Sequence, residues 1–148
     1  MWDNRKFTDI VVACSKDSCK IKCHRAVLAN SPVFEAQLER WTGNGKEVHV
    51  EGVGADVEAM LKCFYTGELD DNANHPAVLT LAHRYQVRDL VCLAKDCIVR
   101  NLSPETVVPA ARSLQLLVND AAHEDDMQTF FEQVRADVSM VRALALAV

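Results

Sequence analysis

Residues 14–34, "CSKDSCKIKCHRAVLANSPVF", change from the period of a β-strand to the spacing of helices partway along. In the first half, Cys19, Ile21 and Cys23 alternate with two lysines, which predicts a strand with one buried and one wet face. The polar residues "SKDS" separate this strand from the β-rich run of residues 10–14. Together the two runs predict a β-hairpin whose apolar face lies in the core.

The second half of the same stretch predicts two helices. Residues 24–31, "HRAVLANS", favour a short helix, and Ser31 followed by Pro32 predicts the capped first turn of a second one. Phe34 gives the second helix an apolar side chain for packing. We expect the glycines of "GNG", residues 43–45, to end it, since glycine readily adopts the backbone conformations of turns.

A third strand and a core helix are predicted downstream. The segment "KEVHV" alternates, with Val48 and Val50 pointing inward. Asp56 predicts an N-cap for the apolar helix that follows it, and Gly67 predicts the end of that helix. The predicted fold class is therefore α+β, with a small three-stranded sheet flanked by α-helices.

Helices are expected to make up most of the remaining chain. Two of them follow up to residue 102, where we expect the first domain, residues 1–102, to close. Ser103 and Pro104 predict the capped start of another helix, and the apolar spacing in "MQTFFEQVRADVSMV" predicts one more. Residues 103–148 are thus predicted to be an annex of two or three helices.

The composition favours a folded intracellular protein. Its 148 residues can form one compact domain with an annex, and a net charge of -5 argues against nucleic acid as a partner. The N-terminal residues contain no apolar run of the length that a signal peptide needs, and no later segment supplies the roughly 20 apolar residues of a membrane span, so we expect neither. Six cysteines without an export signal predict reduced thiols in the nucleus or cytoplasm, although an even number would also allow disulfides.

Four potential metal ligands, Cys14, Cys19, Cys23 and His24, lie close together in the sequence. The chain has no CxxC pair, and the alternation directs Cys23 inward while His24 points away or begins a helix. Packing in the core is the favoured interpretation, and a zinc site is the weaker alternative. A disulfide between Cys14 and Cys19 is geometrically conceivable, but a reducing compartment argues against it.

We find no catalytic or cofactor motif. The GxSxG signature is absent, and "GVGADVEAM", residues 52–60, lacks the lysine of a phosphate-binding loop. His49, His75 and His123 are expected on the surface. The sequence therefore predicts no catalytic residue, no cofactor, no metal and no small-molecule ligand.

The ordered segments "FTDIVV", "KIKCHRAVLANSPVF", "VHVEGVGADVEAMLKCFYTGEL" and "VLTLAHRYQVRDLVCLAKDCIVRNLS" resemble the BTB/POZ domain family. Residues 7–9 match the start of its first strand, and His24, Arg25, Leu28 and Ala29 match its H-K/R-x-x-L-A helix. The chain most resembles the BTB region of MATH-BTB adaptors of the speckle-type POZ protein kind. "NLSPETVVPAARSLQL" is similar to the helical 3-box, or BACK-like extension, that follows the BTB domain there.

This resemblance implies a protein–protein interaction module and not an enzyme. It implies homodimerisation and binding to Cullin-3 in a ubiquitin ligase, and the alternative is a BTB protein that oligomerises or regulates without binding cullin. Asp9 and Arg25 occupy the family's paired acidic and basic positions near the dimer interface, together with Phe7. "MWDNRK" retains at most the last turn of the N-terminal helix that the family also uses in its dimers.

The resemblance also places a cullin-facing loop after the "SPVF" helix. In the family this loop carries a hydrophobic-x-Glu motif, whereas this chain has Trp41, Thr42, Gly43 and Asn44 there and lacks the glutamate. Trp41 is either an apolar anchor for the partner or a side chain that packs over the helix end.

Overall fold

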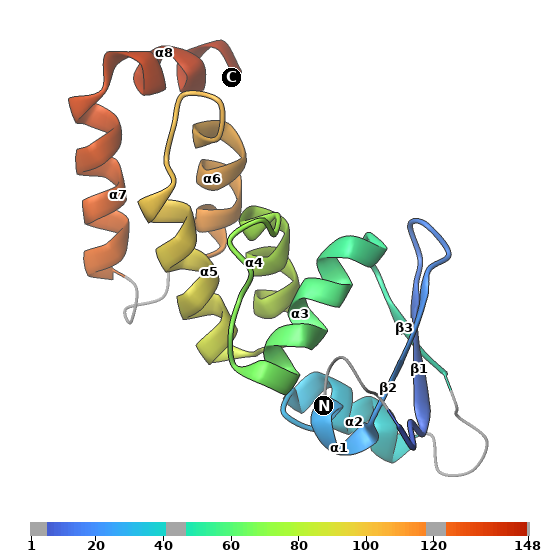
Figure 1. Cartoon of the computed structure of the whole chain (residues 1–148). Helices are drawn as coiled ribbons and strands as arrows, with labels where there is room; N and C mark the ends of the chain where they lie inside the picture. Colours follow the sequence, from blue (N-terminus) through green and yellow to red (C-terminus); the bar gives the residue numbers. More distant parts are fainter. Residues whose placement is uncertain (1–5, 41–46, 118–123, 148) are drawn as a thin grey trace.

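A small sheet lies at one end of the molecule, and helices extend away from it toward the C-terminus (Figure 1). The computed structural model describes residues 6–40, 47–117 and 124–147. Within these ranges it contains three strands, eight α-helices and one 3-10 helix. The strands are β1 (Ile10–Cys14), β2 (Lys20–Cys23) and β3 (Glu47–Val50). The helices are α1 (Arg25–Leu28), α2 (Pro32–Arg40), α3 (Gly54–Thr66), α4 (His75–Arg84), α5 (Arg88–Arg100), α6 (Val107–Leu114), η1 (Gln115–Leu117), α7 (Glu124–Ala136) and α8 (Val138–Ala147).

The sheet has β1 at its centre. β1 pairs antiparallel with β2, placing Val12 opposite Ile21, and parallel with β3, placing Val12 opposite Val48. Val12 is fully buried, because the central strand is covered by neighbours on both edges and by helices on one face. The predicted hairpin, third strand and α+β fold class are confirmed.

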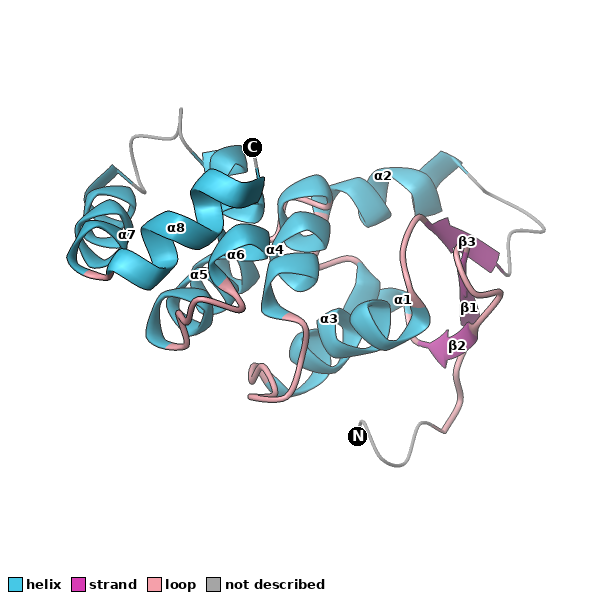
Figure 2. Cartoon of the chain, turned by 90° about the horizontal axis from the view of Figure 1, so that it is seen from above, coloured by secondary structure: helices cyan, strands magenta, loops and turns pink. Residues whose placement is uncertain are grey.

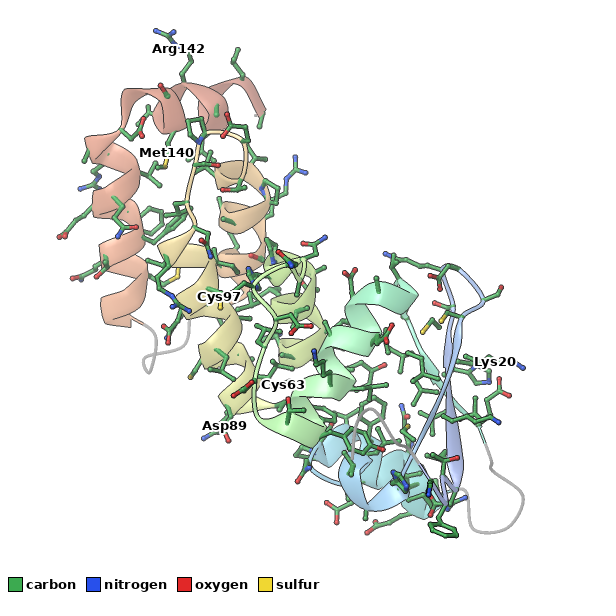
Figure 3. All side chains as sticks on the ribbon, viewed as in Figure 1. Lys20, Cys63, Asp89, Cys97, Met140 and Arg142 are labelled. Atoms are coloured by element: carbon green, nitrogen blue, oxygen red, sulfur yellow. The ribbon has the colours of Figure 1, made fainter. Side chains whose placement is uncertain are left out.

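Helices cover one face of the sheet, and the other face remains polar. Figure 2 shows α1, α2 and α3 on the same side of the three strands. On the opposite face Lys20 projects away from the helices (Figure 3), and its Nζ lies 3.6 Å from Oε2 of Glu47. His49 is exposed on that face, as predicted. The two-residue period thus separates core side chains from solvated ones.

The start of α2 confirms the predicted cap and adds a tertiary contact. The N–H of Phe34 donates to Oγ of Ser31 at 3.3 Å, which is N-cap geometry. The Ser31 hydroxyl donates in turn to the main-chain oxygen of Tyr85 at 2.6 Å. The ring of Phe34 stacks on that of Tyr85, with 4.3 Å between centroids. One buried serine therefore fixes both the first turn of α2 and its contact with the end of α4.

The start of α3 differs from the prediction. Asp56 does not precede the helix; it lies in the first turn, and α3 begins at Gly54. Asp17 of the β1–β2 turn supplies the missing acceptor, since its Oδ2 accepts the N–H of Gly54 at 2.8 Å. A Cβ at position 54 would lie only 2.9 Å from this oxygen. Glycine has no Cβ and therefore avoids the clash. The end of α3 at Gly67, with φ of 74°, is as predicted.

The helix predicted from Ser103 begins later, at Val107. Thr106 precedes the helix, and its Oγ1 accepts the N–H of Ser103 at 2.9 Å, so residues 103–106 form a turn of their own. Pro109 then falls in the first helical turn, where an N–H has no intrahelical partner to lose. The proline fits there, and this explains the later start.

The apolar stripe of residues 127–141 is divided between two helices, so that three α-helices follow residue 102 in the described part of the chain, within the predicted two or three. α7 ends at Ala136, and α8 begins at Val138. Oδ1 of Asp137 accepts the N–H groups of Ser139 at 2.9 Å and Met140 at 3.3 Å, which caps α8. The apolar spacing continues across the break between α7 and α8, so the periodicity alone did not indicate the cap at Asp137.

His75 was predicted on the surface and is instead buried, with 7% of its area exposed. It is the first residue of α4, and its Nε2 lies 3.0 Å from the main-chain oxygen of Asp70. The contact requires the ring to donate from Nε2, which satisfies the buried nitrogen. His123 and the "GNG" glycines lie outside the described residues. No helix in the described part of the chain is long and apolar enough to cross a bilayer.

Candidate functional site

The residues expected at a dimer interface lie together where the N-terminal segment enters β1. Oδ1 of Asp9 accepts the main-chain N–H of Arg25 at 2.8 Å, and the N–H of Asp9 donates to the carbonyl of Cys23 at 3.2 Å. Asp9 therefore joins the end of β2 to the first turn of α1. The side chain of Asp9 is exposed and Arg25 is half-buried. The two residues lie close together, as predicted, and the contact between them is the hydrogen bond by which Asp9 caps α1.

Phe7 lies two residues earlier and projects into solvent. Its side chain is 94% exposed, and its φ of 59° is in the left-handed region, which is uncommon for an aromatic residue. A phenylalanine side chain usually buries a large apolar area on folding or binding. Phe7 thus offers a large apolar group directly beside the Asp9 corner.

A network around His24 holds the chain just before Phe7. The hydroxyl oxygen of Tyr65 accepts the main-chain N–H of His24 at 3.0 Å and lies 2.6 Å from Nδ1 of the ring. Nε2 of His24 lies 2.6 Å from the carbonyl oxygen of Lys6. This pattern fits a hydroxyl that donates to Nδ1 and an imidazole that donates from Nε2. Sequence reasoning missed the network, because Tyr65 is 41 residues from His24.

The candidate cullin-facing residues, Trp41, Thr42, Gly43 and Asn44, lie outside the described residues. The preceding helix α2 ends at Arg40, and β3 resumes at Glu47.

The cysteines near the hairpin are free thiols. Cys14 and Cys23 are buried, and Cys19 is partly exposed at the end of the hairpin. Burial, and then the neighbouring Cys19 and Asp17, raise the pKa of the Cys14 thiol to about 11, so that it is protonated at neutral pH. In the described part of the chain no three histidine, cysteine, aspartate or glutamate side chains are grouped as a metal site requires.

The C-terminal helices share the core of the first part of the chain. Val107 and Leu114 of α6 and Phe130 of α7 are buried in the same cluster as Val12 of the sheet. The hydrophobic core is therefore continuous across residue 102. The division into residues 1–102 and 103–148 remains a prediction.

Comparison with known proteins identifies relatives of this chain. The BTB/POZ domain model matches residues 1–102. Mouse TD and POZ domain-containing protein 5 is 34% identical over 124 residues, covering 78% of this chain and 35% of the relative. Mouse TD and POZ domain-containing protein 4 is 31% identical over 113 residues, covering 71% and 30%. The fly longitudinals lacking protein-like protein (Drosophila melanogaster) is 34% identical over 91 residues, covering 60% and 70%.

The chain spans about a third of the length of the two mouse relatives. Among solved structures, the BTB domain of zebrafish PATZ1 is similar, with a TM-score of 0.55 and 22% identity over 67% of this chain and 81% of that one. At this identity the structural likeness concerns the fold alone.

Proposed function

Because the chain belongs to the BTB/POZ domain family of protein–protein interaction modules, we propose that it is an adaptor that pairs with a second copy of itself and binds Cullin-3 of a ubiquitin ligase. The observation that carries the first part is the exposed Phe7 ring beside the Asp9–Arg25 corner.

Two features favour self-association through this corner: the Phe7 side chain is exposed, and contacts on both sides of it already hold the chain in place. Phe7 contributes an aromatic side chain of the size that dominates interface energetics. The contacts of His24 with Tyr65 and Lys6, and of Asp9 with Arg25, hold the chain on both sides of Phe7. Less conformational entropy is therefore lost when the ring is buried by a partner.

Light scattering over a range of concentrations tests the pairing. We expect a dimer for the wild-type chain and a shift toward monomer for Phe7→Asp, because a buried unpaired carboxylate is costly. Leu146→Asp is the matched control, since Leu146 is 82% exposed on α8 at the other end of the molecule (Figure 1). A wild-type monomer at high concentration, or equal masses for the two variants, contradicts the proposal. Asp9→Ala should weaken the dimer less than Phe7→Asp does.

Cullin-3 binding is supported by the resemblance to MATH-BTB adaptors and by the helices that follow residue 102. The segment "NLSPETVVPAARSLQL" is similar to the 3-box of those adaptors, and in this chain the helices α6 to α8 follow residue 102. The loop with Trp41, Thr42, Gly43 and Asn44 is the proposed contact, with Trp41 as its apolar anchor.

Calorimetric titration with the Cullin-3 N-terminal domain tests the second part. We expect binding that Trp41→Ala weakens by about tenfold or more, the effect of a modest hot spot. Gly43→Glu should strengthen binding, because it restores the spacing of the hydrophobic-x-Glu motif. Val53→Ala, at another exposed apolar residue, should leave the affinity unchanged. Absence of binding at roughly tens of micromolar, about 6 kcal/mol of binding free energy, rules out the ligase adaptor.

The missing glutamate favours one alternative, a BTB protein that oligomerises or regulates without binding cullin. A dimer in light scattering combined with no heat in the cullin titration identifies this case. The two measurements therefore separate pairing from cullin binding.

A further inference from the structure

Two thiols face each other across the β1–β2 hairpin. The register pairs Ala13 with Lys20, and the next pair is Cys14 and Cys19, where the N–H of Cys14 donates to the carbonyl of Cys19 at 2.8 Å. The Cys19 side chain is also near enough to contribute, after burial, to the raised pKa of the Cys14 thiol. Because opposed residues of an antiparallel pair share a face of the sheet, both cysteines lie on its core side.

The surroundings keep this pair in position. Oδ1 of Asp17 accepts the N–H of Cys19 at 3.3 Å, and its Oδ2 accepts the N–H of Gly54 at the start of α3. Cys19 also lies close against Gly54, because a Cβ there would be only 2.7 Å from Cβ of Cys19. The hairpin turn is thus tied to α3, which keeps Cys19 opposite Cys14.

We propose that Cys14 and Cys19 form an oxidation site that closes to an intramolecular disulfide on exposure to a peroxide. The inference is independent of the proposed adaptor function. Directly opposed residues of an antiparallel pair have Cα atoms about 5.5 Å apart when hydrogen-bonded, which is within the range of disulfides. Their Cβ atoms must approach by up to about 1 Å. The resulting strain makes such a disulfide easy to reduce.

The order of the two steps follows from exposure. Cys19 is partly exposed, so its thiolate attacks the peroxide, cleaves the O–O bond and becomes a sulfenic acid with release of hydroxide. Cys14 is buried and loses its proton as its sulfur attacks the sulfenic sulfur, which expels water and forms the S–S bond. In total two thiols and one hydrogen peroxide give one disulfide and two waters. A dithiol reductant returns the pair to the free thiols.

Peptide mapping tests the site, because Lys16 lies between the two cysteines. After treatment with hydrogen peroxide and blocking of free thiols, trypsin should yield peptide 7–16 linked to peptide 17–20. The linked species should be about 2 Da lighter than the sum of the two free peptides, and reduction should separate it. Peptides that are both alkylated, or a Cys19 peptide carrying sulfinic or sulfonic acid without the link, contradict the proposal.

Matched variants assign the link to this pair. Cys92→Ser removes the exposed cysteine of α5 and should leave the linked peptide unchanged. Cys19→Ser changes a partly exposed residue and should abolish the link, leaving Cys14 available for alkylation after denaturation. The assignment is also overturned if the wild-type chain forms a disulfide that involves Cys92, or one that joins Cys14 to a cysteine other than Cys19.

Discussion

Asp9 and Asp17, which lie just before β1 and in the turn after it, each accept a hydrogen bond from the first N–H of a helix. Asp9 accepts from Arg25 at the start of α1, and Asp17 accepts from Gly54 at the start of α3. Neither helix has a side-chain cap from the residue that precedes it. The sheet thus caps these two helices from a distance, and the negative charge lies at the positive end of each helix.

At the scale of single residues, Asp17→Ala should destabilise the fold by about 1 kcal/mol, the usual effect of losing an N-cap acceptor. Chemical denaturation measures the loss. Asp71→Ala removes the same charge from an exposed loop position and should change the free energy of unfolding much less. Equal effects for the two variants would show that charge, and not the contact with Gly54, is responsible.

Among the elements, the contact between α2 and α4 depends on one hydroxyl and one ring pair. Ser31 caps α2 and donates to the carbonyl of Tyr85, while Phe34 stacks on the Tyr85 ring. Both Ser31 and Phe34 are fully buried. The Ser31 hydroxyl and the Tyr85 carbonyl are therefore costly to leave without a hydrogen-bond partner, since no water replaces the lost partner.

Ser31→Ala should therefore lower the free energy of unfolding by about 1 to 3 kcal/mol, because it removes the cap and leaves a buried carbonyl without this donor. Thermal or urea unfolding with circular dichroism provides the measurement. Ser15→Ala changes an exposed serine after β1 and is the control. If both substitutions had the same small effect, the Ser31 hydroxyl would not stabilise the α2–α4 contact.

At the scale of the whole molecule, one continuous core buries several ionisable side chains, and their pKa values make the stability of the fold depend on pH. The cluster extends from Val12 in the sheet to Met140 in α8. Burial raises the pKa values of Cys63 and Tyr85 as well as that of Cys14. All three groups therefore keep their protons in the folded chain at a pH where the unfolded chain loses them, and folding weakens as the pH rises.

The free energy of unfolding should accordingly fall between pH 9 and about pH 11, the interval between the ordinary and the raised pKa of Cys14. Cys14→Ala should make this fall less steep. Part of the fall should remain, because the pKa values of Cys63 and Tyr85 are also raised. Denaturant unfolding at a series of pH values measures the slope. Cys92→Ala, which removes an exposed thiol, should retain the wild-type slope. Parallel pH profiles for Cys14→Ala and the wild type are the contrary result.

Local patterns determined most of the elements. The alternation of Cys19, Ile21 and Cys23 predicted β2, the Ser31 cap predicted the start of α2, and Gly67 predicted the end of α3. These signals depend on residues within about four positions of one another, so a linear sequence contains them in full. The family resemblance added the grouping of Phe7, Asp9 and Arg25, and the structure places those residues at one corner.

Tertiary structure alone decided which distant groups complete these elements. Asp17 replaces Asp56 as the residue that satisfies the start of α3, and Tyr65 meets His24 from 41 positions away. The placement of Cys14 opposite Cys19 likewise depends on the register of the hairpin. Amphipathic periodicity shows which face of an element is buried, whereas the partner of a polar atom depends on the packing of elements that are remote in the chain.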